Sequence, residues 1–183
     1  MVRTHGVGAA TTKRIAAEAG LSEGSLYNHF PDKARLLIDL VLERLPGIRE
    51  IFARLADDAA LPSLESRLTA ALVDMIAFYH EAQPILGGIA ADPELLMKSR
   101  ERFAEASGGP QRAHEKLASI LAEEKARGRL AAGADPQALA SMLIGACTDY
   151  ALLARILGRH PHGLPPRQYV QGIMDALRPA LFA

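Results

Sequence analysis

The most informative pattern of apolar and polar positions lies near the N-terminus, over residues 11–37. Ile15, Ala16 and Ala19 recur at the spacing of one helical face, while the charged side chains around them fall elsewhere. Gly20 follows directly, and glycine ends a helix in the left-handed conformation at the least cost. The pattern therefore predicts a short helix that stops at Gly20.

Two further short helices are predicted immediately after this one. Thr12 and Ser22 are expected to cap the first and second helices, because a hydroxyl oxygen can accept a hydrogen bond from a free N–H of the first turn. Leu26 and Phe30, four residues apart, form the inward face of the second helix. Pro31 disfavours helical geometry at the preceding residue, so this helix should contain only about seven or eight residues.

The first two helices form a helix-turn-helix, and a third helix follows them directly. Asp32 is expected to cap this helix, and its buried side carries Leu36, Leu37, Leu40 and Val41. At about 100° per residue, Gly24 and Asn28 point away from Leu26 and therefore face outward. A short helix with an outward polar face is typical of a recognition helix that enters the major groove of DNA. A plain helical hairpin is the alternative, but its packing does not require these outward polar residues.

These residues resemble the tetracycline-repressor-like (TetR) family of bacterial regulators. The matching pattern lies within residues 6–45 and comprises Thr12, Ile15, Ala16, Ala19, Gly20, Leu21, Ser22, Gly24, Ser25, Leu26, Tyr27, His29, Phe30, Lys33, Leu36 and Leu37. The resemblance implies that DNA phosphates are held by Thr12, Tyr27, His29 and Lys33. It also implies that base edges are faced by Lys13, Glu23, Gly24, Ser25 and Asn28.

Elementary chemistry supports several of these roles. Asn28 carries the paired donor and acceptor that match adenine, and Gly24 has no side chain to hold the helix away from the bases. Lys33 offers a cation in the first turn of a helix, where free N–H groups also attract phosphate. Two positions have simpler alternatives. Tyr27 could be an ordinary half-buried aromatic residue, and Glu23 could serve the helix dipole.

Family members carry another helix before this motif, and residues 1–10 do not show its pattern. This stretch contains two glycines and has no apolar 3.6-residue period. Without a bracing helix, the inner face of Ile15 and Leu26 would be partly bare. We therefore expect that Met1 is not the natural start, or that further residues precede it in the natural chain.

Residues 46–183 are predicted to form a helical body, because Pro and Gly divide them into amphipathic helical segments. We therefore expect a DNA-binding domain at 1–45 and an effector-binding and dimerisation domain at 46–183. The last two helices have broad apolar stripes, made of Leu139, Met142, Leu143, Ala146, Tyr150, Leu152, Leu153, Ile156 and Leu157, and of Tyr169, Val170, Ile173, Met174, Leu177 and Leu181. The resemblance implies that such a pair meets its mate as a four-helix bundle. A monomer that buries both stripes internally is the alternative.

A pocket for a small-molecule effector is expected among the central helices of this body. The candidate lining residues are Met75, Phe78, Tyr79, Phe103, His114, Cys147 and Tyr150. Each could equally belong to an ordinary core, because apolar stripes at helical spacing are also what cores look like. Few charged residues fall on these inner faces, which favours a largely apolar effector.

Composition refines this interpretation only slightly. Lys plus Arg and Asp plus Glu both number 21, and residues 1–45 hold six basic against five acidic residues, a net charge of +1. This basic bias is weak for a DNA-binding segment. The single Cys147 allows no intrachain disulfide, as is typical of the reducing cytoplasm. No apolar run approaches the roughly 18–20 residues that span a bilayer.

No catalytic, metal or cofactor site is predicted. The G-x-S-x-G pattern around Ser22 follows a helix, whereas a hydrolase elbow needs a strand, and His160 and His162 lack further ligands nearby in sequence. We therefore predict a cytoplasmic, ligand-responsive, homodimeric repressor that binds a palindromic operator in double-stranded DNA. The alternative is a helical small-molecule-binding protein or enzyme that has lost DNA binding, with the short N-terminus as its main support.

Overall fold

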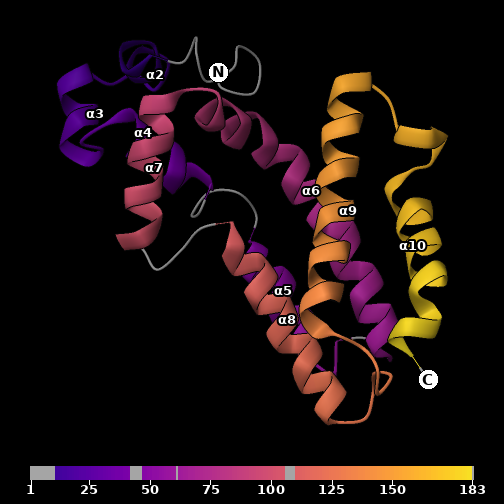
Figure 1. Cartoon of the computed structure of the whole chain (residues 1–183). Helices are drawn as coiled ribbons and strands as arrows, with labels where there is room; N and C mark the ends of the chain where they lie inside the picture. Colours follow the sequence, from indigo (N-terminus) through magenta and orange to yellow (C-terminus); the bar gives the residue numbers. More distant parts are fainter. Residues whose placement is uncertain (1–10, 42–46, 61, 106–109, 183) are drawn as a thin grey trace. The chain divides into compact units, whose positions relative to one another are not determined.

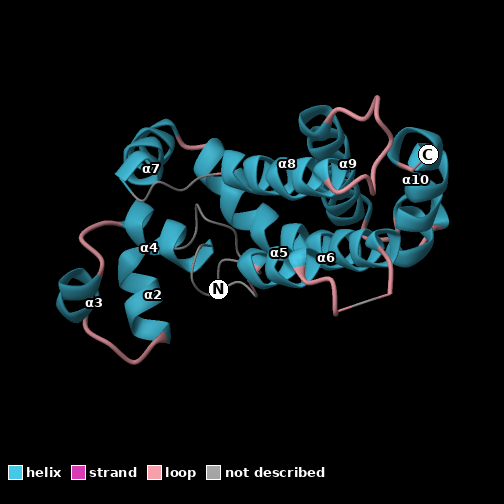
Figure 2. Ribbon diagram, turned by 90° about the horizontal axis from the view of Figure 1, so that it is seen from below, coloured by secondary structure: helices cyan, strands magenta, loops and turns pink. Residues whose placement is uncertain are grey.

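The computed structural model describes residues 11–41, 47–60, 62–105 and 110–182, and every regular element in these ranges is helical (Figures 1 and 2). The all-α prediction is therefore confirmed. The helices are α2 (Thr12–Glu18), α3 (Glu23–His29), α4 (Lys33–Asp39), α5 (Ile48–Ala56), α6 (Leu64–Ala90), α7 (Pro93–Glu105), α8 (Gln111–Ala126), α9 (Pro136–Leu157) and α10 (Pro166–Leu181), and a 3-10 turn lies at Pro161–Gly163. The expectation about a missing first helix concerns residues 1–10, which lie outside the described residues.

The chain divides into two compact units that do not follow one cut along the sequence. Unit 1 combines Met1–Pro46 with Glu81–Gly109, and unit 2 combines Gly47–His80 with Pro110–Ala183. The predicted division into 1–45 and 46–183 places a boundary at nearly the same point. It differs from the compact units because residues 81–109 group with the N-terminal segment, so that α6 contributes to both units.

Unit 1 has an apolar core that explains this grouping. Its buried residues are Ala34, Leu37, Ile38 and Val41 from the α4 segment, Ile85 and Ile89 from α6, and Leu95 from α7. Asp39 adds a polar link, because its carboxylate accepts hydrogen bonds from Arg35 Nε on α4 and from Arg102 Nη2 on α7, the latter at 3.3 Å. Residues 85–95 thus bury the apolar face that α4 presents.

Unit 2 has its own core, in which α8 packs against α9 and α5. Its fully buried large side chains are Leu55, Leu68, Leu72, Met75, Leu117, Leu121, Leu143, Ile144, Tyr150 and Met174. Cys147 Sγ on α9 donates to the Leu72 carbonyl on α6 at 3.5 Å. The Ala131 N–H donates to the Leu181 carbonyl at 2.9 Å, which fastens the end of α10 to the segment before α9. Each long helix of this unit therefore has a buried side.

Helix α9 corrects one expectation from the sequence. By length and composition alone it could cross a membrane, whereas no run of that kind was predicted. The difference arises because small residues such as Ala140 and Ala151 raise the hydropathy of a helix without forming an obvious apolar run. Core helices meet the same criterion, and α9 buries Leu143, Ile144 and Tyr150 within unit 2.

The N-terminal caps of α2, α3 and α4 agree with the sequence-based prediction for two helices and differ from it for one. Ser22 Oγ accepts from the Ser25 N–H at 3.0 Å, and Asp32 Oδ1 accepts from the Arg35 N–H at 2.8 Å, as predicted. The prediction that Thr12 caps α2 is wrong. Thr11 Oγ1 accepts from the Arg14 N–H at 3.3 Å, so α2 is capped one residue earlier.

The change Thr11→Ala is expected to lower the free energy of unfolding by about 1 kcal/mol, because α2 then loses the acceptor for one of its free N–H groups. Urea unfolding at fixed protein concentration measures this loss. Thr11→Ser keeps the hydroxyl and serves as the control, with most of the stability retained. Equal losses in both variants would show that the Thr11 cap does not stabilise α2.

Candidate nucleic-acid interface

The helix-turn-helix predicted from the sequence is formed by α2, the turn after it, and α3. Gly20 in the turn has φ +69°, a left-handed conformation that glycine adopts without strain. Leu26 is buried at 5% exposure and anchors α3 from within. The helix ends at His29 because Phe30, which precedes Pro31, has an extended backbone with φ −131°. These local features give α3 the seven-residue length expected of it.

The outer face of α3 is open to solvent. Gly24, Asn28 and His29 are all exposed. Among the described residues, a Cβ added to Gly24 would meet Ser22 Oγ alone, at 3.9 Å, so packing within the chain does not require glycine here. A position without a side chain on an exposed helix lets that helix approach a surface closely. The geometry is compatible with the base-reading roles predicted for Gly24 and Asn28.

Three of the predicted DNA-contacting side chains are hydrogen-bonded to one another. Thr12 Oγ1 on α2 donates to Glu23 Oε1 at 2.7 Å and lies 3.2 Å from the Tyr27 hydroxyl, both on α3. Because threonine has a single hydroxyl proton, Tyr27 is the donor in the second bond. Tyr27 is 46% exposed, so its hydroxyl is held at the surface. A DNA phosphate could replace Thr12 as the acceptor of the Tyr27 proton.

Glu23 is engaged in joining the two helices. Its half-buried carboxylate accepts from Thr12, and it lies in the first turn of α3, where a negative charge is favoured. A contact between Glu23 and a base edge would require this bond to break. The structure therefore gives Glu23 a role in positioning Thr12 that the sequence did not reveal.

The other predicted DNA-contacting residues lie around this cluster. Lys13 on α2 is exposed, and Ser25 is half-buried with its Oγ 3.0 Å from Ser22 Oγ. Lys33, the first residue of α4, is half-buried. All nine predicted residues thus lie on α2, α3 or the start of α4, within unit 1. Their division into phosphate and base contacts remains a prediction.

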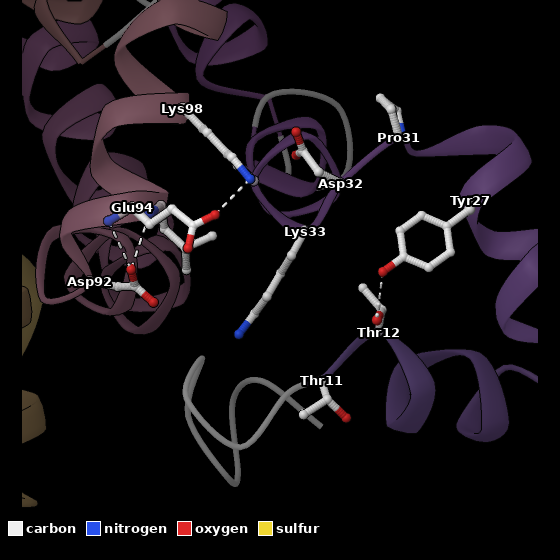
Figure 3. Close-up of a pocket in the computed structure, with 11 residues that line it drawn as sticks. Thr11, Thr12, Tyr27, Pro31, Asp32, Lys33, Asp92, Glu94 and Lys98 are labelled. Atoms are coloured by element: carbon white, nitrogen blue, oxygen red, sulfur yellow. Dashed lines mark hydrogen bonds and ion pairs between the residues drawn. The ribbon is translucent and has the colours of Figure 1, made fainter.

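A cavity of about 410 Å³ adjoins the Thr12–Tyr27 pair within unit 1 (Figure 3). Thr12, Tyr27 and Lys33 line it, together with residues that the sequence did not single out for DNA binding, namely Thr11, Pro31, Asp32, Ala34, Asp92, Glu94, Leu95 and Lys98. Asp92, Glu94, Leu95 and Lys98 follow the other lining residues by about 60 positions or more in the sequence. No local pattern could have placed them beside α3.

The residues predicted to bind an effector do not line this cavity, and they are divided between the units. Phe103 packs against the core of unit 1. The other six belong to unit 2, where His114 is half-buried and the remaining five are buried, namely Met75, Phe78, Tyr79, Cys147 and Tyr150. Burial raises the pKa of the Cys147 thiol to about 12, and burial together with nearby Cys147 raises the pKa of Tyr79 to about 12. Both groups are therefore neutral at physiological pH.

The histidine pair and Tyr150 have contacts of their own. The Tyr150 hydroxyl donates to the Leu164 carbonyl at 2.8 Å, so His160 Nδ1, at 3.0 Å, is the donor to the tyrosine oxygen. His162 has φ 55°, a left-handed conformation within the 3-10 turn. Among the described residues, no group of three or more His, Cys, Asp or Glu side chains is arranged to hold a metal ion.

Comparison with known sequences points to bacterial regulators. Residues 1–40 match the family described as bacterial regulatory proteins, tetR family. The nucleoid occlusion factor SlmA of Photobacterium profundum is 30% identical over 142 residues, which cover 78% of this chain and 71% of that protein. SlmA of Vibrio cholerae is also 30% identical, over 144 residues that cover 76% and 70% of the two chains.

Comparison with solved structures shows the same fold. A TetR-family transcriptional regulator from Mesorhizobium loti has a TM-score of 0.75 and 20% identity, with 100% of this chain and 91% of that chain covered. SmeT, the repressor of the multidrug efflux pump SmeDEF of Stenotrophomonas maltophilia, has a TM-score of 0.69 and 20% identity, with 100% and 85% covered. At these identities the likeness is one of fold.

Proposed function

Because this chain belongs to the tetR family of bacterial regulatory proteins, which are DNA-binding and non-enzymatic, we propose that it is a homodimeric repressor released from a palindromic operator by a small, largely apolar effector. The observation that carries this proposal is the exposed outer face of α3, with Gly24 and Asn28 on it and Leu26 buried behind it. A capped helix of seven residues with this exposed face fits the major groove.

Two substitutions on α3 separate contacts with the DNA phosphates from contacts with the base edges. Tyr27→Phe removes a hydrogen bond to a charged phosphate but keeps the ring, and should weaken binding to all sequences by about tenfold or more. Asn28→Ala should lose discrimination at particular base pairs, worth roughly 1–3 kcal/mol, with a smaller effect on binding elsewhere. Binding to a randomised operator library measures both effects. Equal losses across the library for both variants would contradict the base-reading role of Asn28.

The proposed homodimer is supported by an apolar stripe on α9 that faces solvent in the single chain. Met142, Leu152 and Ile156 are 54%, 42% and 69% exposed. At about 100° per residue these three fall within an arc of about 80°, and Gly145 lies within the same arc. Such a stripe is unusual on the surface of a monomer. A second copy of the chain would cover it and would space two recognition helices for a palindrome.

The proposed effector site lies in unit 2, among the buried residues predicted from the sequence. Neutral Tyr79 and Cys147 and the apolar Met75 and Phe78 provide an environment for an apolar molecule. Cys147 is a free buried thiol, which is consistent with the proposed location in the cytoplasm. Tyr79→Ala should weaken effector-induced release from DNA without weakening DNA binding itself.

Release requires that the effector binds more tightly to a form with low DNA affinity, with a coupling of typically 1–3 kcal/mol. One candidate for the element that transmits this change is the helix that begins at Lys33, which follows the recognition helix α3 and is described as far as Val41. Helix α6 is a second candidate, because it contributes residues to both units and carries Pro84 in its interior. Pro84 lacks an N–H, so the helix is weakened near the point where the unit changes.

A second candidate function is suggested by the relatives named nucleoid occlusion factor, which are more similar in sequence than the repressors of known structure. A factor of that kind should bind at many places on the chromosome. A repressor should bind at few operators and leave them when its effector is added. Chromatin immunoprecipitation with sequencing therefore distinguishes the two functions.

A further inference from the structure

Lys98 on α7 lies in the wall of the cavity that the predicted phosphate-binding residues Thr12, Tyr27 and Lys33 also line. Figure 3 shows the residues of α7 on one side and Tyr27 with Thr12 on the other, with Asp32 and Lys33 between them. The Lys98 side chain is 38% exposed. A cation that has no role in the helix-turn-helix itself is therefore placed beside it.

The three carboxylates that line the cavity together with Lys98, namely Asp32, Asp92 and Glu94, differ in the contacts they make. Asp92 Oδ1 accepts from the Glu94 and Leu95 N–H groups at 3.0 and 3.1 Å, which caps α7. Asp32 caps α4 in the same way. Glu94 instead forms an ion pair with Lys98, with 2.8 Å between Nζ and Oε1, and its side chain is 72% exposed. Of these three carboxylates, Glu94 is thus the one that forms an ion pair with the Lys98 ammonium group.

We propose that Lys98 is a further DNA phosphate-binding residue, and that Glu94 competes with the phosphate for its ammonium group. An exposed ion pair one helical turn apart is weak and is screened by salt. A DNA phosphate bound at Tyr27 and Thr12 would be a stronger counter-ion for Lys98 than Glu94 is, because the neighbouring phosphates of the DNA add to the negative potential. The inference rests on the proposed orientation of the helix-turn-helix on DNA.

The pKa of Lys98 is raised, first by its hydrogen bond to Glu94 and then by the charge of that carboxylate, so the side chain remains a cation at neutral pH. Nothing in the sequence around Lys98 indicates this role, since α7 reads as an ordinary amphipathic helix. The role follows from the grouping of residues 81–109 with the N-terminal segment in unit 1.

The test measures how the affinity of the full chain for a labelled 40-base-pair duplex of mixed sequence depends on salt. Each phosphate contact contributes about 0.9 to the slope of log K against log salt, which corresponds to about fivefold in affinity near 0.15 M salt. Lys98→Gln should therefore lower the slope by about one and the affinity by about fivefold, equally for all sequences. Lys98→Arg should retain both.

The matched control is Lys116→Gln, which makes the same change in net charge on an exposed residue of α8 in unit 2. It should leave the slope unchanged. An unchanged slope in Lys98→Gln, or an equal decrease in both glutamine variants, would overturn the role of Lys98. Circular dichroism melting confirms that the variants are folded.

Glu94→Gln tests the competition. It should raise affinity about two- to fivefold in the unaltered chain, since it frees Lys98 and removes a negative charge from the cavity wall. Most of this gain should disappear when Lys98→Gln is also present, and an equal gain in both backgrounds would overturn the competition. Tyr27→Phe separates this proposal from the proposed function: if Tyr27→Phe weakens binding and Lys98→Gln does not, the inference about Lys98 alone is wrong. If the unaltered chain shows no salt-dependent binding, the proposed function fails with it.

Discussion

Ile156→Glu is expected to convert the proposed dimer into monomers and to lower the affinity for an operator by a factor of about 100 or more. Ile156 is 69% exposed on α9, so the substitution removes little packing from the folded chain. In a symmetric dimer, however, it would place two carboxylates in an apolar interface, where burying an unpaired charge is very unfavourable. A monomer binds one half-site only, and loss of the second site typically costs a factor of 10² to 10⁴.

Sedimentation equilibrium and a titration with operator DNA measure the two effects. Met97→Glu is the matched control, because Met97 is 56% exposed and apolar but lies on α7 in unit 1. This variant should keep the oligomeric state of the unaltered protein. If Ile156→Glu remains dimeric, or if the unaltered chain is a monomer, the α9 stripe is not the subunit interface.

The helix-turn-helix could be predicted from the sequence because its determinants are local. Ser22 and Asp32 cap the helices that follow them directly, Gly20 ends a helix beside itself, and Pro31 acts on its neighbour Phe30. The error at the first cap was one residue. Thr11 and Thr12 are adjacent and have the same side chain, so the sequence does not show which of them is the cap. The extended backbone at Thr11 makes that residue the cap. Helix boundaries are uncertain by about this amount in any sequence-based assignment.

The composition of the two units could not be predicted in the same way. Asp39 and Arg102 are 63 residues apart in the sequence, and their ion pair belongs to the packing of α7 against α4. Helical periodicity shows that each of these helices has an apolar side, but it does not show which partner covers that side. For the same reason the sequence missed Lys98 and placed Phe103 with residues of the other unit.

A buried ion-pair network in unit 2 was also missed, and it carries the second large prediction. Glu124 on α8 is 2% exposed and Arg67 on α6 is 4% exposed, with 3.5 Å between Arg67 Nη2 and Glu124 Oε2. Arg129 donates two hydrogen bonds to the Glu124 carboxylate, and Arg67 Nε donates to the Leu55 carbonyl. Asp58 joins the network from its exposed side through Arg67 and Arg129, at 2.9 and 3.0 Å. The network connects α6, α8 and the segments after α5 and α8.

Glu124→Ala is expected to lower the free energy of unfolding by about 3–5 kcal/mol, which is a large fraction of the stability of a typical domain. The loss arises because Arg67 stays buried without its buried partner, and because Arg129 loses both of its bonds to the carboxylate. Urea unfolding at fixed protein concentration measures it. Glu123→Ala, at an exposed position on the same helix, should change stability by no more than about 0.5 kcal/mol.

A double variant shows whether the loss of stability in Glu124→Ala comes from the buried Arg67 charge that has lost its buried partner. In Arg67→Met with Glu124→Leu, both buried ions are replaced by apolar side chains of similar size, so no unpaired charge is left inside the unit. Replacement of a whole buried pair is often close to neutral, whereas removal of one partner is not. The double variant should therefore be more stable than Glu124→Ala alone. If it is less stable, the two ions stabilise unit 2 through their attraction, and the account based on a buried charge that has lost its buried partner is wrong.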